Sequence, residues 1–122
     1  MSEDRRRQTG LAGEEAATTF LEESGYMIIE RNWRCRSGEI DIIASMDNLL
    51  VFVEVRTRRA GGRFGTAAES VDRRKQQQVA AIAQVYLRMR QAAYPPMRFD
   101  VIAVTMERDD SISEIKHIKA AF

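Results

Sequence analysis

The 122-residue sequence has one cysteine, one histidine and two prolines. A single cysteine, Cys35, excludes an intramolecular disulfide and suits a reducing cytoplasm. The one histidine, His117, cannot build a zinc site, and it is remote in the sequence from Cys35. Since the sequence also lacks a signal peptide and any apolar run near the length of a membrane span, we expect a cytoplasmic protein with no membrane partner.

The sequence has no excess of charge of one sign, because 19 Lys and Arg stand against 18 Asp and Glu, for a net charge of +1. The distribution is uneven, however: residues 56–75 include seven basic and two acidic residues. Two further basic clusters are "RRR" at 5–7 and "RNWRCR" at 31–36. Such segments can follow a phosphate backbone, or they can be ordinary solvated faces, and the charge pattern alone does not separate the two.

The composition is that of a folded protein, with 44% hydrophobic and 30% charged residues. The length favours one domain over residues 1–122, and no repeat or linker divides it. Residues 1–9 are expected to be a flexible basic lead before the first helix.

Hydrophobic periodicity predicts two helices and five strands in the order α-β-β-β-α-β-β. The expected helices are about 10–24, ended by Gly25, and 69–91. The expected strands are 26–35, 39–46, 49–58, 97–106 and 112–119. Short turns imply that the first three strands form an antiparallel meander, and a glycine-rich loop follows them. The predicted fold is an α/β sandwich in which helices flank a mixed sheet.

Two carboxylates interrupt the apolar strands: Asp41 stands between isoleucines and Glu54 between valines. If a two-residue turn joins these strands, Asp41 lies directly across from Glu54, and Glu39 across from Arg56. Like charges directly opposite each other destabilise a sheet. The pair therefore needs a cation, a shared proton or a strong donor.

Two readings of this pair are open from the residues alone. In the first and preferred one, Arg56 and Arg58 are the donors, and the pair belongs to a purely structural ion-pair ladder. In the second, Asp41 and Glu54 bind a divalent metal such as Mg²⁺, with the backbone carbonyl of Val55 as a further oxygen ligand. Either of two residues of the first helix could complete that site: Glu14 or Glu15.

A carboxylate on one strand, followed on the next strand by Glu-x-Lys, is the pattern of the PD-(D/E)XK nuclease superfamily, which includes archaeal-type Holliday junction resolvases. Asp41 and the "EVR" at 54–56 resemble this pattern on such a core. More closely, "AGEEA", "RNWRCRSGEIDIIA", "VFVEVRTR" and "RFDVIAV" resemble the YraN-like family of small bacterial proteins, usually described as predicted endonucleases. The resemblance runs from about residue 10 to residue 105. It implies a restriction-endonuclease-like αβββαββ core and a Mg²⁺- or Mn²⁺-dependent nuclease acting on DNA, including structured or branched DNA.

The resemblance also implies roles for individual residues. Asp41 and Glu54 become the metal ligands, and Glu14 takes the supporting acidic position ahead of Glu15. Arg56 stands where the superfamily has lysine; it can stabilise charge on the phosphate, but arginine does not serve as a base. Lys75 would supply an ammonium group instead, if the second helix reaches the site.

Asp100, in "RFDV", lies outside this core site and is expected to pair with Arg98 or another arginine. No base-reading motif is visible, so recognition of shape or backbone is expected. Six basic residues are expected to hold the nucleic-acid backbone: Arg58, Arg59, Arg63, Arg73, Arg74 and Lys75.

Three functions are compatible with the sequence. The first is a metal-dependent nuclease, with Arg56 stabilising the phosphate. The second is a non-catalytic nucleic-acid-binding module. The permanent positive charge of Arg56 favours this function. The third is a protein-interaction module, in which the weak fifth strand, at a sheet edge, pairs with another copy as a homodimer. Metal binding separates the first from the second, and nucleic-acid binding separates both from the third.

Overall fold

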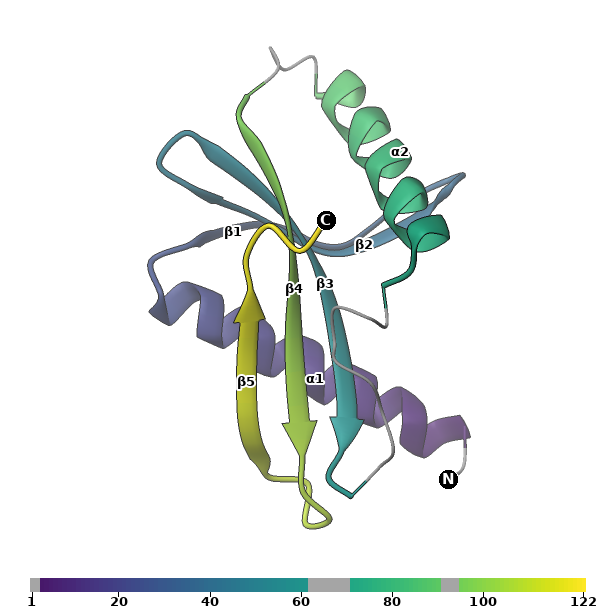
Figure 1. Cartoon of the computed structure of the whole chain (residues 1–122), viewed down its shortest axis with the longest axis vertical. Coiled ribbons are helices and arrows are strands. Elements are labelled where there is room, and N and C mark those ends of the chain that lie inside the picture. The colour runs from purple at the N-terminus through teal and green to yellow at the C-terminus, as the bar shows by residue number, and fades with distance from the viewer. Residues whose placement is uncertain (1–2, 62–70, 91–94) are drawn as a thin grey trace.

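The computed structural model describes residues 3–61, 71–90 and 95–122. These residues form two helices and five strands in the expected order: α1 (Glu3–Glu23), β1 (Met27–Cys35), β2 (Gly38–Met46), β3 (Leu49–Arg59), α2 (Arg73–Met89), β4 (Met97–Met106) and β5 (Ile112–Ile118) (Figure 1). The strands make one sheet in the order β1-β2-β3-β4-β5. Only β3 and β4 are parallel, so the mixed α/β sheet predicted from the sequence is confirmed.

The sheet buries one hydrophobic cluster on each face. On the first face, Leu21 of α1 packs with Val53 and other strand residues, and Figure 1 shows α1 crossing behind β3 and β4. On the second face, Ile82 and Tyr86 of α2 pack with Phe52. Because neighbouring residues of a strand point to opposite faces, β3 contributes to both clusters.

Helix α1 begins earlier than the sequence predicts. It starts at Glu3 rather than near Gly10, so the described part of the expected flexible lead is helical. Two features explain the extension: acidic residues occupy the first turn, where they complement the helix dipole, and the buried Thr9 accepts a hydrogen bond from Arg59 of β3 at 3.0 Å. The second of these is a tertiary contact, which hydrophobic periodicity does not reveal.

The register of β2 on β3 is the one expected from a two-residue turn. Their pairing runs to Ile42 opposite Val53 and ends there, one step before Asp41 would face Glu54. From that point β3 continues beside β4 alone, while β2 remains paired with β1. The two carboxylates therefore lie where the strands separate.

This separation overturns the expected position of Glu39. Glu39 does not face Arg56; it forms an ion pair with Arg34 of β1 at 2.7 Å. The alternation of faces along β2 is also interrupted at Asp41, because Ile40 packs on the α2 side of the sheet and Ile42 on the α1 side. Regular alternation holds only while a strand stays regular, and β2 leaves β3 at this residue.

Helix α2 is shorter than the predicted 69–91. Asp72 is its N-cap, and the Asp72 carboxylate accepts a hydrogen bond from the backbone N–H of Lys75 at 2.9 Å. Residues 69, 70 and 91 of the predicted helix lie outside the described residues. Neither described helix has the length and hydropathy needed to cross a membrane.

Candidate active site

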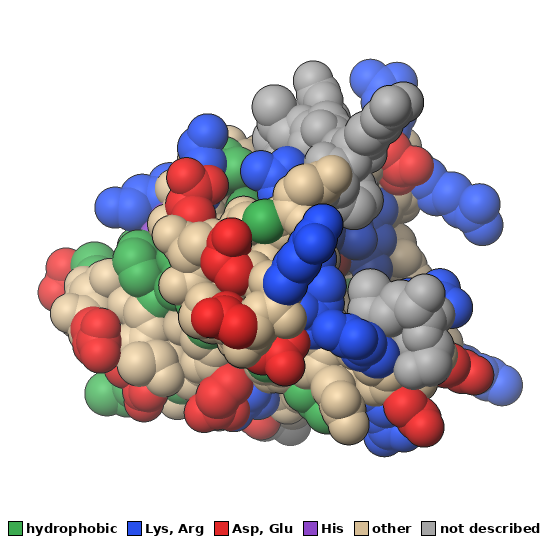
Figure 2. All heavy atoms as spheres, turned by 90° about the horizontal axis from the view of Figure 1, so that it is seen from below, with side chains coloured by type: hydrophobic (Ala, Val, Ile, Leu, Met, Phe, Trp, Pro, Cys, Tyr) green, Lys and Arg blue, Asp and Glu red, His purple; other side chains and the backbone are tan. Residues whose placement is uncertain are grey.

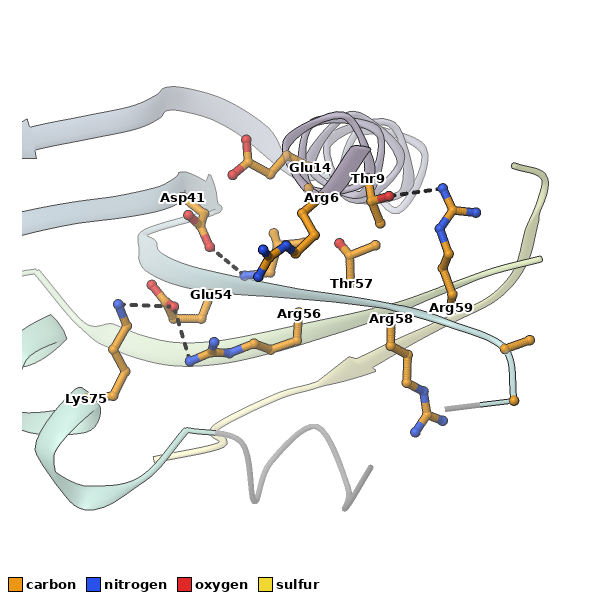
Figure 3. Close-up of a pocket in the computed structure, with 14 residues that line it drawn as sticks. Arg6, Thr9, Glu14, Asp41, Glu54, Arg56, Thr57, Arg58, Arg59 and Lys75 are labelled. Atoms are coloured by element: carbon orange, nitrogen blue, oxygen red, sulfur yellow. Dashed lines mark hydrogen bonds and ion pairs between the residues drawn. The ribbon is translucent and has the colours of Figure 1, made fainter. Parts of the chain in front are cut away.

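A pocket of about 690 Å³ lies along the part of β3 that β2 has left. Its walls come from α1, β2, β3 and the first turn of α2 (Figure 3). Its charged lining residues are Glu14, Asp41, Glu54, Arg6, Arg56, Arg58, Arg59 and Lys75. Val55 also lines it, so the pocket contains the predicted metal ligands and Arg56, together with Glu14 of the two helix candidates.

Asp41 occupies the position where a ladder hydrogen bond would otherwise form. Its Oδ2 atom accepts a hydrogen bond from the backbone N–H of Val55 at 2.8 Å (Figure 3). Burial raises the pKa of Asp41, and the bond from Val55 opposes that rise. Because the N–H and C=O of one strand residue project toward the same edge, the Val55 carbonyl also faces the side from which β2 departs.

Glu54 is the most buried carboxylate of the pocket, with 5% of its side chain exposed. Its Oε2 atom lies 3.7 Å from the Lys75 ammonium and 3.9 Å from Nη2 of Arg56. Its Oε1 atom has no hydrogen-bond partner in the described part of the chain. Burial, and then the nearby charge of Asp41, raises the pKa of Glu54 to about 7, although Lys75 and Arg56 act against this rise.

Glu14 reaches the pocket because α1 approaches β3 very closely. A β-carbon on Gly13 would lie 1.8 Å from Oγ1 of Thr57, so only glycine fits there. Burial, followed by the charge of Asp41, raises the pKa of Glu14. Glu15 instead points to solvent and pairs with Arg31 at 2.9 Å, so Glu14 is the helix carboxylate at the site.

The oxygen atoms of the pocket can be compared with the ligands that a divalent cation takes. Within residues 3–61, 71–90 and 95–122, no three Asp, Glu, His or Cys side chains are close enough to hold one metal ion. Of the three carboxylates that line the pocket, the two that come from strands are Asp41 and Glu54, and the Val55 carbonyl projects toward the side of Asp41. This set fits Mg²⁺, which usually keeps several waters and takes one or two carboxylates beside a phosphate.

The basic residues expected to bind nucleic acid have unlike surroundings. Arg58 is exposed and lines the pocket, and Arg73 and Arg74 are exposed at the start of α2. Lys75 approaches Glu54, as described above. Arg63 lies outside the described residues.

Arg59, although it lines the pocket, is already bound within the protein. Its guanidinium donates to Thr9 at 3.0 Å, to the Glu107 carbonyl at 3.1 Å and to the Asp110 carboxylate at 2.7 Å. Arg6 was not among the predicted site residues, yet it extends from α1 into the pocket (Figure 3). The basic cluster at 5–7 was its only signal in the sequence.

Comparisons with known proteins agree on one family. The model of the uncharacterised protein family UPF0102 matches residues 13–104. A UPF0102 protein of Moorella thermoacetica is 47% identical over 117 residues, which cover 96% of this chain and 97% of the relative. A UPF0102 protein of Symbiobacterium thermophilum is 54% identical over 98 residues, covering 80% and 82%. The chain therefore belongs to the UPF0102 family, the YraN-like family that its motifs indicated.

Proposed function

We propose that this protein is a Mg²⁺- or Mn²⁺-dependent nuclease that hydrolyses DNA in the pocket along β3. Glu54 is the observation that carries the proposal. Its carboxylate is buried, and both neighbouring cations approach Oε2, while Oε1 has no partner among the described residues. A buried charge that is incompletely paired costs free energy, and a cation bound at Oε1 would offset that cost.

The residues around Glu54 fit the requirements of phosphodiester hydrolysis. Asp41, Glu54 and the Val55 carbonyl would hold the metal, which when bound supplies an activated water and neutralises charge on the phosphate. Lys75 and Arg56 hold two positive charges beside Glu54, where negative charge develops on the phosphate. Arg56 acts by charge and hydrogen bonding, because arginine stays protonated.

A specific observation favours a second candidate, a nucleic-acid-binding module without catalysis. Lys75 and Arg56 lie 3.7 and 3.9 Å from Glu54, so two permanent cations already offset its charge. In this alternative the protein binds the phosphate backbone through the same pocket and requires no metal.

A cleavage assay distinguishes these candidates. Purified protein would be incubated with plasmid, linear and branched DNA in Mn²⁺, and parallel reactions would contain EDTA. We expect cleavage by the wild type and by Glu15→Gln, a matched control at an exposed glutamate. Asp41→Asn and Glu54→Gln should reduce the rate by roughly a hundredfold or more, because each removes a charged ligand. Binding of DNA without any cleavage in Mn²⁺ would favour the non-catalytic module.

A further inference from the structure

The pocket follows a free strand edge. From Glu54 to Arg59, β3 pairs with β4 on one side, and no described strand pairs with its other side. The rise of an extended strand makes this stretch roughly 17 Å long. Lining residues occur along the whole stretch and continue to Gly61, so the pocket is an elongated groove.

The two ends of the groove differ in charge. The acidic end contains Asp41 and Glu54, and Glu14 of α1 lies there as well. The other end is basic, and there Arg59 is bound to Thr9 of α1. Arg6 and Arg58 also line the groove, and Figure 3 shows Arg58 beyond Arg56 along β3. Figure 2, seen from the end of the sheet where β3 and β4 terminate, shows Lys and Arg side chains gathered beside a hollow on this face.

We infer that this groove binds one single strand of nucleic acid, with its phosphates along the free edge of β3. The inference rests on the proposed function in placing the phosphate to be cut at Asp41 and Glu54. Arg6 and Arg58 then hold phosphates on one side of that position. Arg59 contributes less, because its guanidinium is bound to Thr9, Glu107 and Asp110.

The depth of the carboxylates favours a single strand over a duplex. Only 5% of the Glu54 side chain is exposed, so a phosphate must enter the groove to approach it. A flexible single strand can bend into the groove, whereas a stiff duplex, with a persistence length of about 50 nm, would rest on the rim. None of the described lining residues is aromatic, so binding depends on phosphate contacts rather than base stacking.

Fluorescence anisotropy tests this inference in EDTA, where no metal-dependent hydrolysis occurs. The probes are a labelled oligothymidylate of about 12 nucleotides and a blunt duplex of equal length. We expect tighter binding of the single strand, and Arg6→Ala and Arg58→Ala should each lower the salt slope for it by about 0.7. Arg36→Ala, at an exposed arginine outside the groove, is the control with the same charge change and should leave the slope unchanged.

Three results would overturn the inference: tighter binding of the duplex, equal effects of Arg36→Ala and Arg58→Ala, or no binding of either probe. The replaced arginines are exposed, and thermal melts of each variant would verify that it is folded. A negative result in this binding test would say nothing against the proposed metal site, because the test is done without metal. Conversely, binding of the single strand without any hydrolysis in Mn²⁺ would refute the proposed nuclease activity but would support the groove as a binding site for a single strand.

Discussion

The buried carboxylate of Glu54 has two cations within 4 Å of one oxygen, whereas its other oxygen has no hydrogen-bond partner among the described residues. Its pKa of about 7 lies above the ordinary 4.5, so the folded protein binds this proton more tightly than the unfolded chain. The contribution of Glu54 to the unfolding free energy is therefore most favourable below about pH 4.5 and becomes less favourable as the pH rises to about 7. Above that pH, the charged group costs at most about 3 kcal/mol.

Glu54→Gln should therefore raise the melting temperature by several degrees in metal-free buffer near pH 8.5. Near pH 5 the gain should largely vanish, because wild-type Glu54 is then protonated. Thermal melts at both pH values measure this, and Glu15→Gln is the control for loss of an exposed carboxylate. A lower melting temperature of Glu54→Gln at the higher pH would mean that Lys75 and Arg56 satisfy the charged carboxylate.

Lys75 and Arg56 approach the same oxygen of Glu54 from different elements, so the role of Lys75 in the proposed cleavage can be tested without changing Arg56. We expect Lys75→Met to slow DNA cleavage by roughly a hundredfold, the usual effect of removing one group that stabilises developing charge. Cleavage rates in Mn²⁺ would be compared with those of Lys116→Met, which removes an exposed lysine of β5 outside the pocket. Equal rates for these two variants would remove Lys75 from the reaction.

At the scale of elements, the closeness of α1 to β3 depends on Gly13. Gly13→Ala places a methyl group 1.8 Å from Oγ1 of Thr57, so the helix or the strand must move. We expect a loss of about 1–3 kcal/mol in unfolding free energy, together with weaker cleavage, because Glu14 moves with the helix. Urea denaturation and the cleavage assay measure the two effects.

Gly10 is a matched control on the same helix, since a β-carbon there meets no atom within 4 Å. Gly10→Ala should raise the unfolding free energy by about 0.5–1 kcal/mol, as expected for alanine within a helix. If both substitutions were equally tolerated, the approach of α1 to β3 would not position the site.

A second element-scale feature joins β5 to the rest of the sheet. Asp100 of β4 is fully buried and binds Arg98 at 2.8 Å, His117 of β5 at 2.7 Å and the Ala120 N–H at 3.0 Å. Arg98 also donates to the Tyr26 hydroxyl at 2.7 Å. Burial alone would raise the pKa of Asp100, but these bonds outweigh it and lower the pKa from 3.8 to about 2.

Because this pKa is lowered, the stabilisation by Asp100 is complete above about pH 4 and is lost as the pH falls toward 2. Asp100→Asn should lower the unfolding free energy at neutral pH by about 3 kcal/mol, since it leaves Arg98 incompletely paired. Hydrogen exchange should then show faster exchange of the β5 amides than of the β2 amides. Uniformly accelerated exchange across the sheet would argue against a local role in holding β5.

At the scale of the whole molecule, local patterns in the sequence predict most of the fold. Alternating branched residues and short turns gave the five strands, and the turn between β2 and β3 gave their register. β5 lies at the sheet edge as expected, and its pairing with another copy stays a prediction. Asp41 and Glu54 were predicted to lie together because carboxylates in apolar strands are conspicuous, and only the family resemblance placed Glu14 with them; all three line one pocket.

The features that escaped prediction depend on contacts between distant segments. The pairing of β2 with β3 ends before Asp41 while β2 stays paired with β1, so the expected position of Glu39 was wrong. The early start of α1 involves Arg59, about fifty residues away along the chain, and brings Arg6 to the pocket. Sequence periodicity carries no information on such contacts.

The proposed metal site is tested most directly by isothermal titration of Mn²⁺ into the wild type and Glu54→Ala, with and without DNA. We expect saturable binding at one site in the wild type and loss of that binding in the variant, because Asp41 alone cannot replace the pair. Arg36→Ala should bind Mn²⁺ like the wild type. Absence of Mn²⁺ binding in the wild type, even with DNA present, would refute the metal site and mean that Lys75 and Arg56, rather than a metal, offset the charge of Glu54.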